Sequence, residues 1–170
     1  LRRTRDKISF SYLISFVWCF DLICLGYGLD WLSRRGNALF ASLNHGWLTH
    51  ALMVSGDEAG ARHHAAQALR RARRSDLLGA SLACRTLALH AAKQGQHAKA
   101  ERWLKTAQHW ANVRESRREQ AENIQCEAQL ALARGDHART QALRDAADIA
   151  FERLGMPAHH AAAGNALQAA

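Results

Sequence analysis

Small and apolar residues recur along this chain at fixed distances from a series of glycines. Gly56, Gly95 and Gly135 lie 39 and 40 residues apart. Small residues stand seven positions before each glycine, and five and twelve positions after it: Thr49, Ala88 and Ala128, then Ala61, Ala100 and Thr140, then Ala68, Ala107 and Ala147. Matching close-contact positions on both sides of a recurring turn predict a helical hairpin repeated in tandem.

Helix breakers between the apolar stretches divide the chain into a series of predicted helices. These cover residues 37–54, 58–74, 77–94, 97–114, 117–134, 137–154 and 158–169. β-branched residues are scarce and alanine is abundant after residue 58, which favours helix and predicts no sheet. Connections of two to four residues force sequential helices to pack antiparallel.

Polar residues at the predicted helix starts support these boundaries. Asp57 and Asp136 follow repeat glycines and are placed to cap the next helix, and Asp76 is placed to cap a helix that begins directly after it. Ser116 and Glu119 match the S-x-x-E capping box, in which two side chains satisfy reciprocal backbone donors.

A hairpin of this length cannot bury its apolar face alone, so neighbouring hairpins must share a core. The chain is therefore expected to be all-α, a right-handed α-solenoid of about seven or eight helices. The expected units lie near residues 40–76, 77–116 and 117–156, with a partial unit at 157–170. Neither end resembles the polar capping unit that a solenoid needs, so we expect a fragment of a longer protein.

The N-terminal segment, residues 1–36, differs in composition from the repeats. Residues 1–7 are basic and residues 8–29 are apolar and aromatic, long enough for a membrane span. Asp21 stands in the middle of that stretch, where a charge is costly in a bilayer, and basic residues on both sides blur the orientation. We expect a buried first helix in a cytoplasmic protein, with a membrane anchor as the alternative.

The net charge is +8 and the isoelectric point is near 10.0, which raises the possibility of a nucleic acid or an anionic surface as partner. Seven arginines form two clusters near the ends of successive predicted second helices: Arg70, Arg71, Arg73, Arg74, Arg114, Arg117 and Arg118. If stacking aligns them, they form a basic ridge. Acidic residues interrupt this field, and no aromatic residues interleave the arginines as a single-strand binder would need.

Motifs for bond chemistry or metal binding are missing from the sequence. The four cysteines are scattered, without a C-x-x-C pair, and adjacent histidines such as His63 and His64 point about 100° apart on a helix. There is no phosphate-binding loop, nucleophile elbow or H-E-x-x-H motif. We therefore expect no metal site, no cofactor and no enzymatic activity.

Three segments align in register: GDEAGARHHAAQALRRA, GQHAKAERWLKTAQHWA and GDHARTQALRDAADIAF. Their pattern resembles the tetratricopeptide repeat, although Cys84 and Ile124 replace the large aromatic usual early in the first helix. The longer spacing is similar to the divergent repeats of large bacterial signalling proteins, such as the maltose-regulator class of transcriptional activators. The resemblance implies the repeat region of a regulatory protein, linked to effector domains outside this chain.

The leading hypothesis is a scaffold whose concave surface binds a protein or peptide. Candidate groove residues are those of the first helices that face away from the paired helix: Asn44, His45, Arg85, His90, Gln125 and Gln129. The alternative is a nucleic-acid or anionic-surface binder that uses the arginine ridge. A third possibility is a spacer between working domains.

Overall fold

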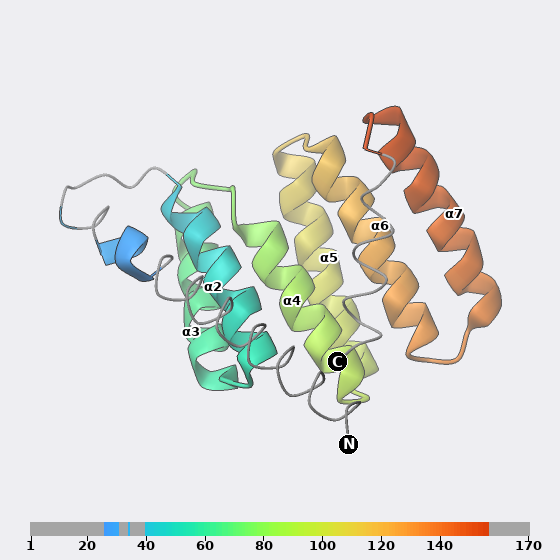
Figure 1. Cartoon of the computed structure of the whole chain (residues 1–170), viewed down its shortest axis with the longest axis horizontal. Coiled ribbons are helices and arrows are strands. Elements are labelled where there is room, and N and C mark those ends of the chain that lie inside the picture. The colour runs from blue at the N-terminus through green and yellow to red at the C-terminus, as the bar shows by residue number, and fades with distance from the viewer. Residues whose placement is uncertain (1–25, 31–33, 35–39, 157–170) are drawn as a thin grey trace, which may run out of the picture. The chain divides into compact units, whose positions relative to one another are not determined.

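The described part of the chain is built from helices (Figure 1). The computed structural model describes residues 26–30, 34 and 40–156. The helices are α2 (Ala41–Ser55), α3 (Glu58–Ala72), α4 (Ala80–Lys93), α5 (His97–Val113), α6 (Arg117–Leu132) and α7 (His137–Arg153). Residues 26–30 form one further helical turn, and no strand occurs among the described residues. The all-α expectation is confirmed, whereas the helix expected at 158–169 lies outside the described residues.

These helices fall into two compact units, one ending at Ala83 and the other beginning at Cys84. The boundary lies inside α4, which is one continuous helix, and not in a linker. Each unit is described by itself below.

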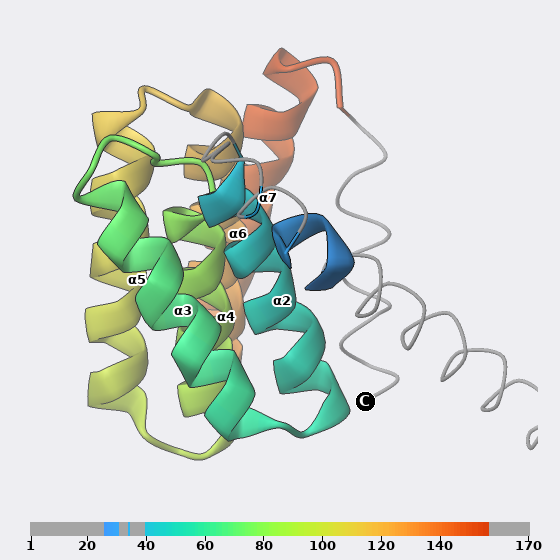
Figure 2. The same ribbon diagram turned by 90° about the vertical axis from the view of Figure 1, so that its left-hand side faces the viewer.

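The first unit contains the antiparallel hairpin of α2 and α3 (Figure 2). A two-residue turn, Gly56 and Asp57, joins the helices. The contact is made of small side chains: Ala61, Ala65 and Ala68 of α3 are buried. Such residues let two helix backbones approach closely. The α2–α3 contact is therefore stabilised mainly by close backbone packing, and less by large apolar side chains.

The second unit has a core shared by successive helices. One cluster joins alanines of α4 to α5 and α6, and its buried members are Ala88, Ala91, Ala92, Ala100, Leu104, Cys126 and Leu130. A second cluster joins Ala121 of α6 to Ala147 and Phe151 of α7. The Phe151 ring is fully buried and is the largest side chain in that interior. In Figure 1, α6 and α7 lie side by side along their lengths.

All nine small residues that mark the repeat in the sequence are buried. Thr140 is the most exposed of them, at 4%. The repeat glycines Gly56, Gly95 and Gly135 all have positive φ angles, between 71° and 88°. The residue after each one donates its backbone N–H to a carbonyl five positions earlier, as in Gln96 N to Ala91 O at 2.9 Å. A turn with a left-handed glycine between two helices is therefore confirmed at each of these three positions.

The same turn occurs between the hairpins with a different residue in the left-handed position. Ser75 has a φ of 75° and Glu115 a φ of 53°. Asp76 N and Ser116 N then donate to carbonyls five positions earlier, at 3.1 and 3.0 Å. An L-residue in this conformation is strained relative to glycine, so these two turns carry a conformational cost that the glycine turns do not.

Helix caps agree with the sequence at two places. Asp57 accepts a hydrogen bond from Gly60 N at 2.9 Å, and Asp136 accepts one from Arg139 N at 3.0 Å. Ser116 also caps α6 by accepting from Glu119 N at 3.4 Å. The reciprocal half of the capping box is wrong, because Ser116 N donates to a backbone carbonyl and the Glu119 carboxylate is engaged elsewhere.

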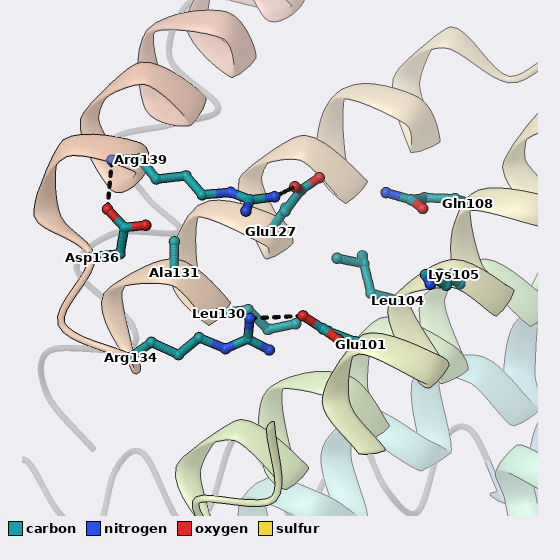
Figure 3. Close-up of a pocket in the computed structure, with 10 residues that line it drawn as sticks. All are labelled: Glu101, Leu104, Lys105, Gln108, Glu127, Leu130, Ala131, Arg134, Asp136 and Arg139. Atoms are coloured by element: carbon teal, nitrogen blue, oxygen red, sulfur yellow. Dashed lines mark hydrogen bonds and ion pairs between the residues drawn. The ribbon is translucent and has the colours of Figure 1, made fainter. Parts of the chain in front are cut away.

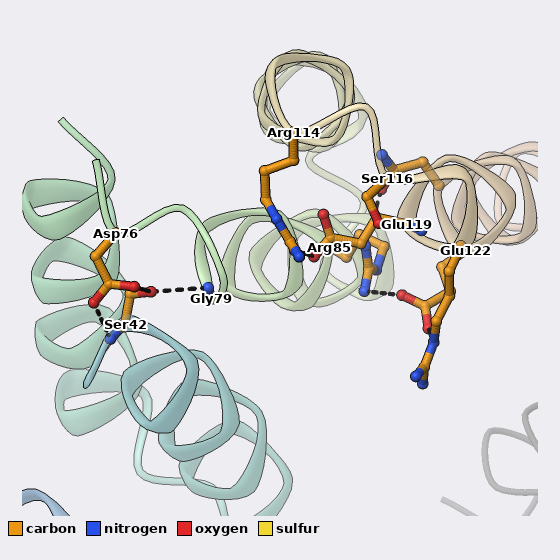
Figure 4. A network of polar contacts seen from close by, with 10 residues as sticks. Ser42, Asp76, Gly79, Arg85, Arg114, Ser116, Glu119 and Glu122 are labelled. Carbon is orange, nitrogen blue, oxygen red and sulfur yellow. Dashed lines mark hydrogen bonds and ion pairs between the residues drawn. The ribbon is translucent and has the colours of Figure 1, made fainter. Parts of the chain in front are cut away.

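The expected role of Asp76 is also wrong. Residues 77–79 form a turn, α4 begins at Ala80, and Asp76 caps the distant helix α2 (Figure 4). Its Oδ2 accepts from Ser42 N at 2.9 Å and its Oδ1 accepts from Ser42 Oγ. Ser42 Oγ in turn accepts from Gly79 N at 3.1 Å. Phe40, at the start of α2, has no side chain that could perform this function.

The turn at Gly79 lies directly against the backbone of α2. A β-carbon at Gly79 would overlap the carbonyl oxygen of Ser42, and one at Gly46 would come within 2.8 Å of Gly79 O. Two glycines are therefore required where these backbones meet. This contact attaches the start of α4 to the first hairpin.

Candidate functional site

The six expected groove residues are divided between the two units. Asn44 and His45 belong to the first unit, and the other four belong to the second: Arg85, His90, Gln125 and Gln129. Asn44, His90, Gln125 and Gln129 are all half-buried. Their arrangement in one groove stays a prediction.

His45 faces the paired helix, contrary to expectation. Its Nδ1 lies 2.9 Å from Nδ1 of His64 on α3, and the ring centroids are 5.1 Å apart. Burial is the main cause that lowers the pKa of His45 to about 4, and the neighbouring His64 lowers it further. Both rings are part of the α2–α3 contact, and the spacing of the residues along the chain did not indicate this pair.

Arg85 is a buried structural residue of the second unit. Only 9% of it is exposed, and its Nη2 lies 2.5 Å from Glu122 Oε2 on α6 (Figure 4). Its Nη1 donates to Asn123 Oδ1 at 3.2 Å. Arg118 lies 3.0 Å from the other oxygen of Glu122, so this carboxylate joins two arginines. The Arg85 guanidinium therefore stabilises the contact between α4 and α6.

Glu119 makes a second buried ion pair in this unit. Its Oε1 accepts from Arg114 Nη1 at 2.8 Å, and its Oε2 accepts no hydrogen bond from the described residues. Burial raises the pKa of Glu119, and the positive charge of Arg114 partly opposes this shift. Glu119 is therefore a desolvated carboxylate held at the junction of α5 and α6.

The arginine clusters occupy separate units. Arg70, Arg71, Arg73 and Arg74 surround the end of α3, as expected. Arg114 follows the last residue of α5, and Arg117 and Arg118 begin α6 directly after it, so the second cluster also lies near the end of a second helix, as expected. Ion pairs with Glu119 and Glu122 partly neutralise the second cluster. The alignment of both clusters into one ridge stays a prediction.

A pocket of about 200 Å³ lies in the second unit among α5, α6 and the start of α7 (Figure 3). Its apolar lining is buried and consists of Leu104, Leu130 and Ala131. The polar residues around it are Glu101, Lys105, Gln108, Glu127, Arg134, Asp136 and Arg139. An apolar floor with polar groups around it is the usual composition of a small binding site.

Two ion pairs border this pocket. Arg134 Nη1 lies 2.7 Å from Glu101 Oε1, which joins the end of α6 to α5. Arg139 Nη2 lies 2.7 Å from Glu127 Oε1, which joins α7 to α6. The hydrogen bond from Arg134 lowers the pKa of Glu101. Figure 3 shows the two guanidinium groups extending in parallel toward the carboxylates.

The charges around the pocket balance. Lys105, Arg134 and Arg139 supply three positive groups, and Glu101, Glu127 and Asp136 supply three negative ones. Lys105 forms an ion pair with none of the described residues, and Gln108 lies beside it along α5. The pocket therefore has an apolar floor, a lysine outside the two ion pairs, and formal charges that sum to zero.

The sequence did not indicate this pocket. Its ion pairs join residues on different helices, and the spacing of Glu101 and Arg134 or of Glu127 and Arg139 matches no local helix pair. Only the order in which the helices pack brings these side chains together.

Metal and membrane features can be assessed over the described ranges. No group of three or more His, Cys, Asp or Glu side chains in residues 26–30, 34 and 40–156 is arranged to hold a metal ion. Over the same ranges, no helix is long and apolar enough to cross a membrane. The expected anchor at residues 8–29 lies almost wholly outside them, as do Cys19 and Cys24.

The remaining cysteines are core residues. Cys84 and Cys126 are free thiols, and burial raises the pKa of each to about 12. A thiol in that state is a poor nucleophile and a poor metal ligand. Both positions therefore act as small apolar side chains.

No family model matches this chain, and neither a curated protein nor a solved structure matches it significantly.

Proposed function

We propose that this chain is a non-enzymatic interaction scaffold, a solenoid of tetratricopeptide-like hairpins that binds a segment of another protein. The observation that carries this proposal is the pocket among α5, α6 and α7, with balanced charges and an apolar floor. A peptide presents apolar side chains and charges of both signs, and so complements such a lining. The function corresponds to the repeat region of a larger regulatory protein in the cytoplasm.

The charge balance favours a peptide over a nucleic acid. A phosphate backbone is a line of negative charge and binds best to a continuous positive field. Here Arg134 and Arg139 are already paired with carboxylates, and Arg114 and Arg118 of the second cluster are paired as well. These four paired arginines therefore contribute less to a positive field than unpaired arginines would.

A random peptide library displayed on phage and panned against the full chain tests this proposal. Peptides that are selected should lose at least about tenfold in affinity when Lys105→Glu reverses the free charge at the pocket, which corresponds to about 1.4 kcal/mol. The matched control is Lys99→Glu, at an exposed position in the first turn of the same helix and outside the pocket.

Two results would contradict the proposal. Selected peptides that bind Lys105→Glu and the unchanged chain equally well would show that the pocket is not the site. Tight binding of a poly-dT oligonucleotide that weakens steeply with salt, together with failure of the peptide selection, would favour the nucleic-acid alternative.

A further inference from the structure

Helix α2 carries an apolar stripe on its outward face. Phe40, Trp47 and Val54 are 51%, 45% and 54% exposed. Trp47 and Val54 are seven residues apart, close to two helical turns, so they lie on one side of the helix, and Phe40 directly precedes its first residue. Thr49, on the opposite side of the helix, is buried, and so is Leu48 on its flank.

The stripe is continuous and not a set of scattered exposed residues. Leu43 and His50 lie between its members and are half-buried. The rings of Trp47 and His50 meet edge to face with centroids 6.3 Å apart. Single exposed apolar residues are ordinary, but a connected row of large ones marks a surface that another segment covers.

The chain enters the described region beside this stripe. Residues 26–30 form a helical turn, and a β-carbon placed on Gly28 would lie 4.0 Å from Asn44 Nδ2 on α2. Asn44 is one turn from both Phe40 and Trp47. The residues that precede position 26 are therefore joined to the chain next to the exposed face of α2.

Those preceding residues are rich in large apolar side chains. Residues 8–25 contain five aromatic residues: Phe10, Tyr12, Phe16, Trp18 and Phe20. As a helix, this segment would be about 27 Å long, and the stripe from residue 40 to residue 54 extends about 21 Å. With Gly28 beside Asn44, an antiparallel run places residues 18–25 opposite positions 47–54, so the segment is long enough to cover the stripe from Trp47 to Val54.

We propose that the C-terminal part of this segment, residues 18–25, docks antiparallel to α2 along the stripe from Trp47 to Val54 and completes the first unit. The length of apolar chain, its point of entry at Gly28 and the exposed row on α2 all support the same occupant. This inference is independent of the peptide pocket, which lies in the other unit. It assigns the aromatic segment to the protein interior in preference to a membrane.

Disulfide trapping in the full chain tests this docking. With Gly28 opposite Asn44, an antiparallel segment places residue 25 opposite position 47, next to Cys24. The variant carries Cys19→Ser and Trp47→Cys, so that Cys24 and position 47 form the test pair. In aqueous buffer, mild oxidation should produce an intramolecular disulfide in the monomer. The matched control, Ala66→Cys with Cys19→Ser, has its new thiol exposed on α3 and should not form one.

Maleimide labelling gives a second readout that does not depend on disulfide geometry. A thiol introduced by Val54→Cys should react about tenfold faster when Trp18→Glu is added, because a buried charge on the segment opposes docking. Labelling of Ala66→Cys should not change. Two results would overturn the proposal. Disulfides that form only between chains would show that a second copy covers the stripe. Insertion of the segment into phosphatidylcholine–phosphatidylglycerol vesicles, with no disulfide in the monomer, would show that the segment binds a membrane instead.

Discussion

Arg85 shows how one side chain determines a helix contact in this protein. Its guanidinium is buried against Glu122 and Asn123, so removing it leaves a desolvated carboxylate with fewer partners. We expect Arg85→Ala to lower the free energy of unfolding by about 2–4 kcal/mol. Because Glu122 keeps its ion pair with Arg118 in this variant, the loss of stability should be smaller than for a buried carboxylate left with no partner.

Urea unfolding followed by circular dichroism measures this change. The matched control is Arg144→Ala, at an exposed position on α7, which should change the free energy of unfolding by less than about 0.5 kcal/mol. If the two substitutions changed the free energy of unfolding equally, the buried pair of Arg85 and Glu122 would not stabilise the fold more than an exposed arginine does.

The histidine pair between α2 and α3 makes stability depend on pH. Burial lowers the pKa of His45 from 6.5 to about 4. His64, Arg71 and His63 contribute to the lowering, and Asp76 opposes it. Because the folded pKa is below the unfolded one, the unfolded chain binds the proton more readily. The stability contribution is therefore complete above pH 6.5 and is lost as the pH falls toward 4.

Since His45 is only about half-buried, solvent screening reduces the expected loss to about 1–2 kcal/mol. Unfolding midpoints in urea at pH of about 7 and about 4.5 measure it. His45→Gln should lessen the difference between the two midpoints, and His137→Gln, at an exposed position, should leave it unchanged. A pH dependence that is identical in all three proteins would contradict the assignment to His45.

At the scale of the helices, the turn residues offer a direct test of strain. Glu115 occupies a left-handed position that glycine fills in the equivalent turns, for example at Gly95. Glu115→Gly should therefore raise the free energy of unfolding by about 0.5–1 kcal/mol, after the greater flexibility of glycine in the unfolded chain is included. Glu152→Gly, in the last turn of α7, should lower it by about 1 kcal/mol. A loss of stability in Glu115→Gly would mean that the side chain makes a compensating contact.

The start of α2 depends on a residue far along the chain. Asp76→Ala removes both hydrogen bonds to Ser42 and should lower the free energy of unfolding by about 1–2 kcal/mol. Hydrogen exchange should report the largest loss of protection in the first turn of α2. If protection is lost instead at Ala80 and its neighbours in α4, Asp76 caps the following helix, as its position in the sequence suggested.

How far these elements could be predicted depends on the range of the interaction. The glycine turns and the caps at Asp57 and Asp136 involve neighbours in sequence, and the pattern predicted them. Asp76 was misassigned because its partner, Ser42, belongs to another helix. Arg85 was expected at a surface because its buried position depends on α6, which no local pattern reveals.

At the scale of the whole molecule, burial of the small residues was predictable because the repeat shows it three times. The pocket was not, since its ion pairs join residues from α5, α6 and α7 that have no common spacing. The stacking of the two units into one solenoid stays a prediction, as do the peptide partner and the link to a regulatory protein.

The peptide-binding surface proposed for the second unit is the pocket among α5, α6 and α7. Hydrogen exchange of the full chain with and without a selected peptide locates the surface that the peptide covers. New protection is expected in α5, near Lys105, and at the start of α7, with no change around the arginines at the end of α3. Protection confined to the end of α3 would contradict this proposal and would move the binding surface to the first unit.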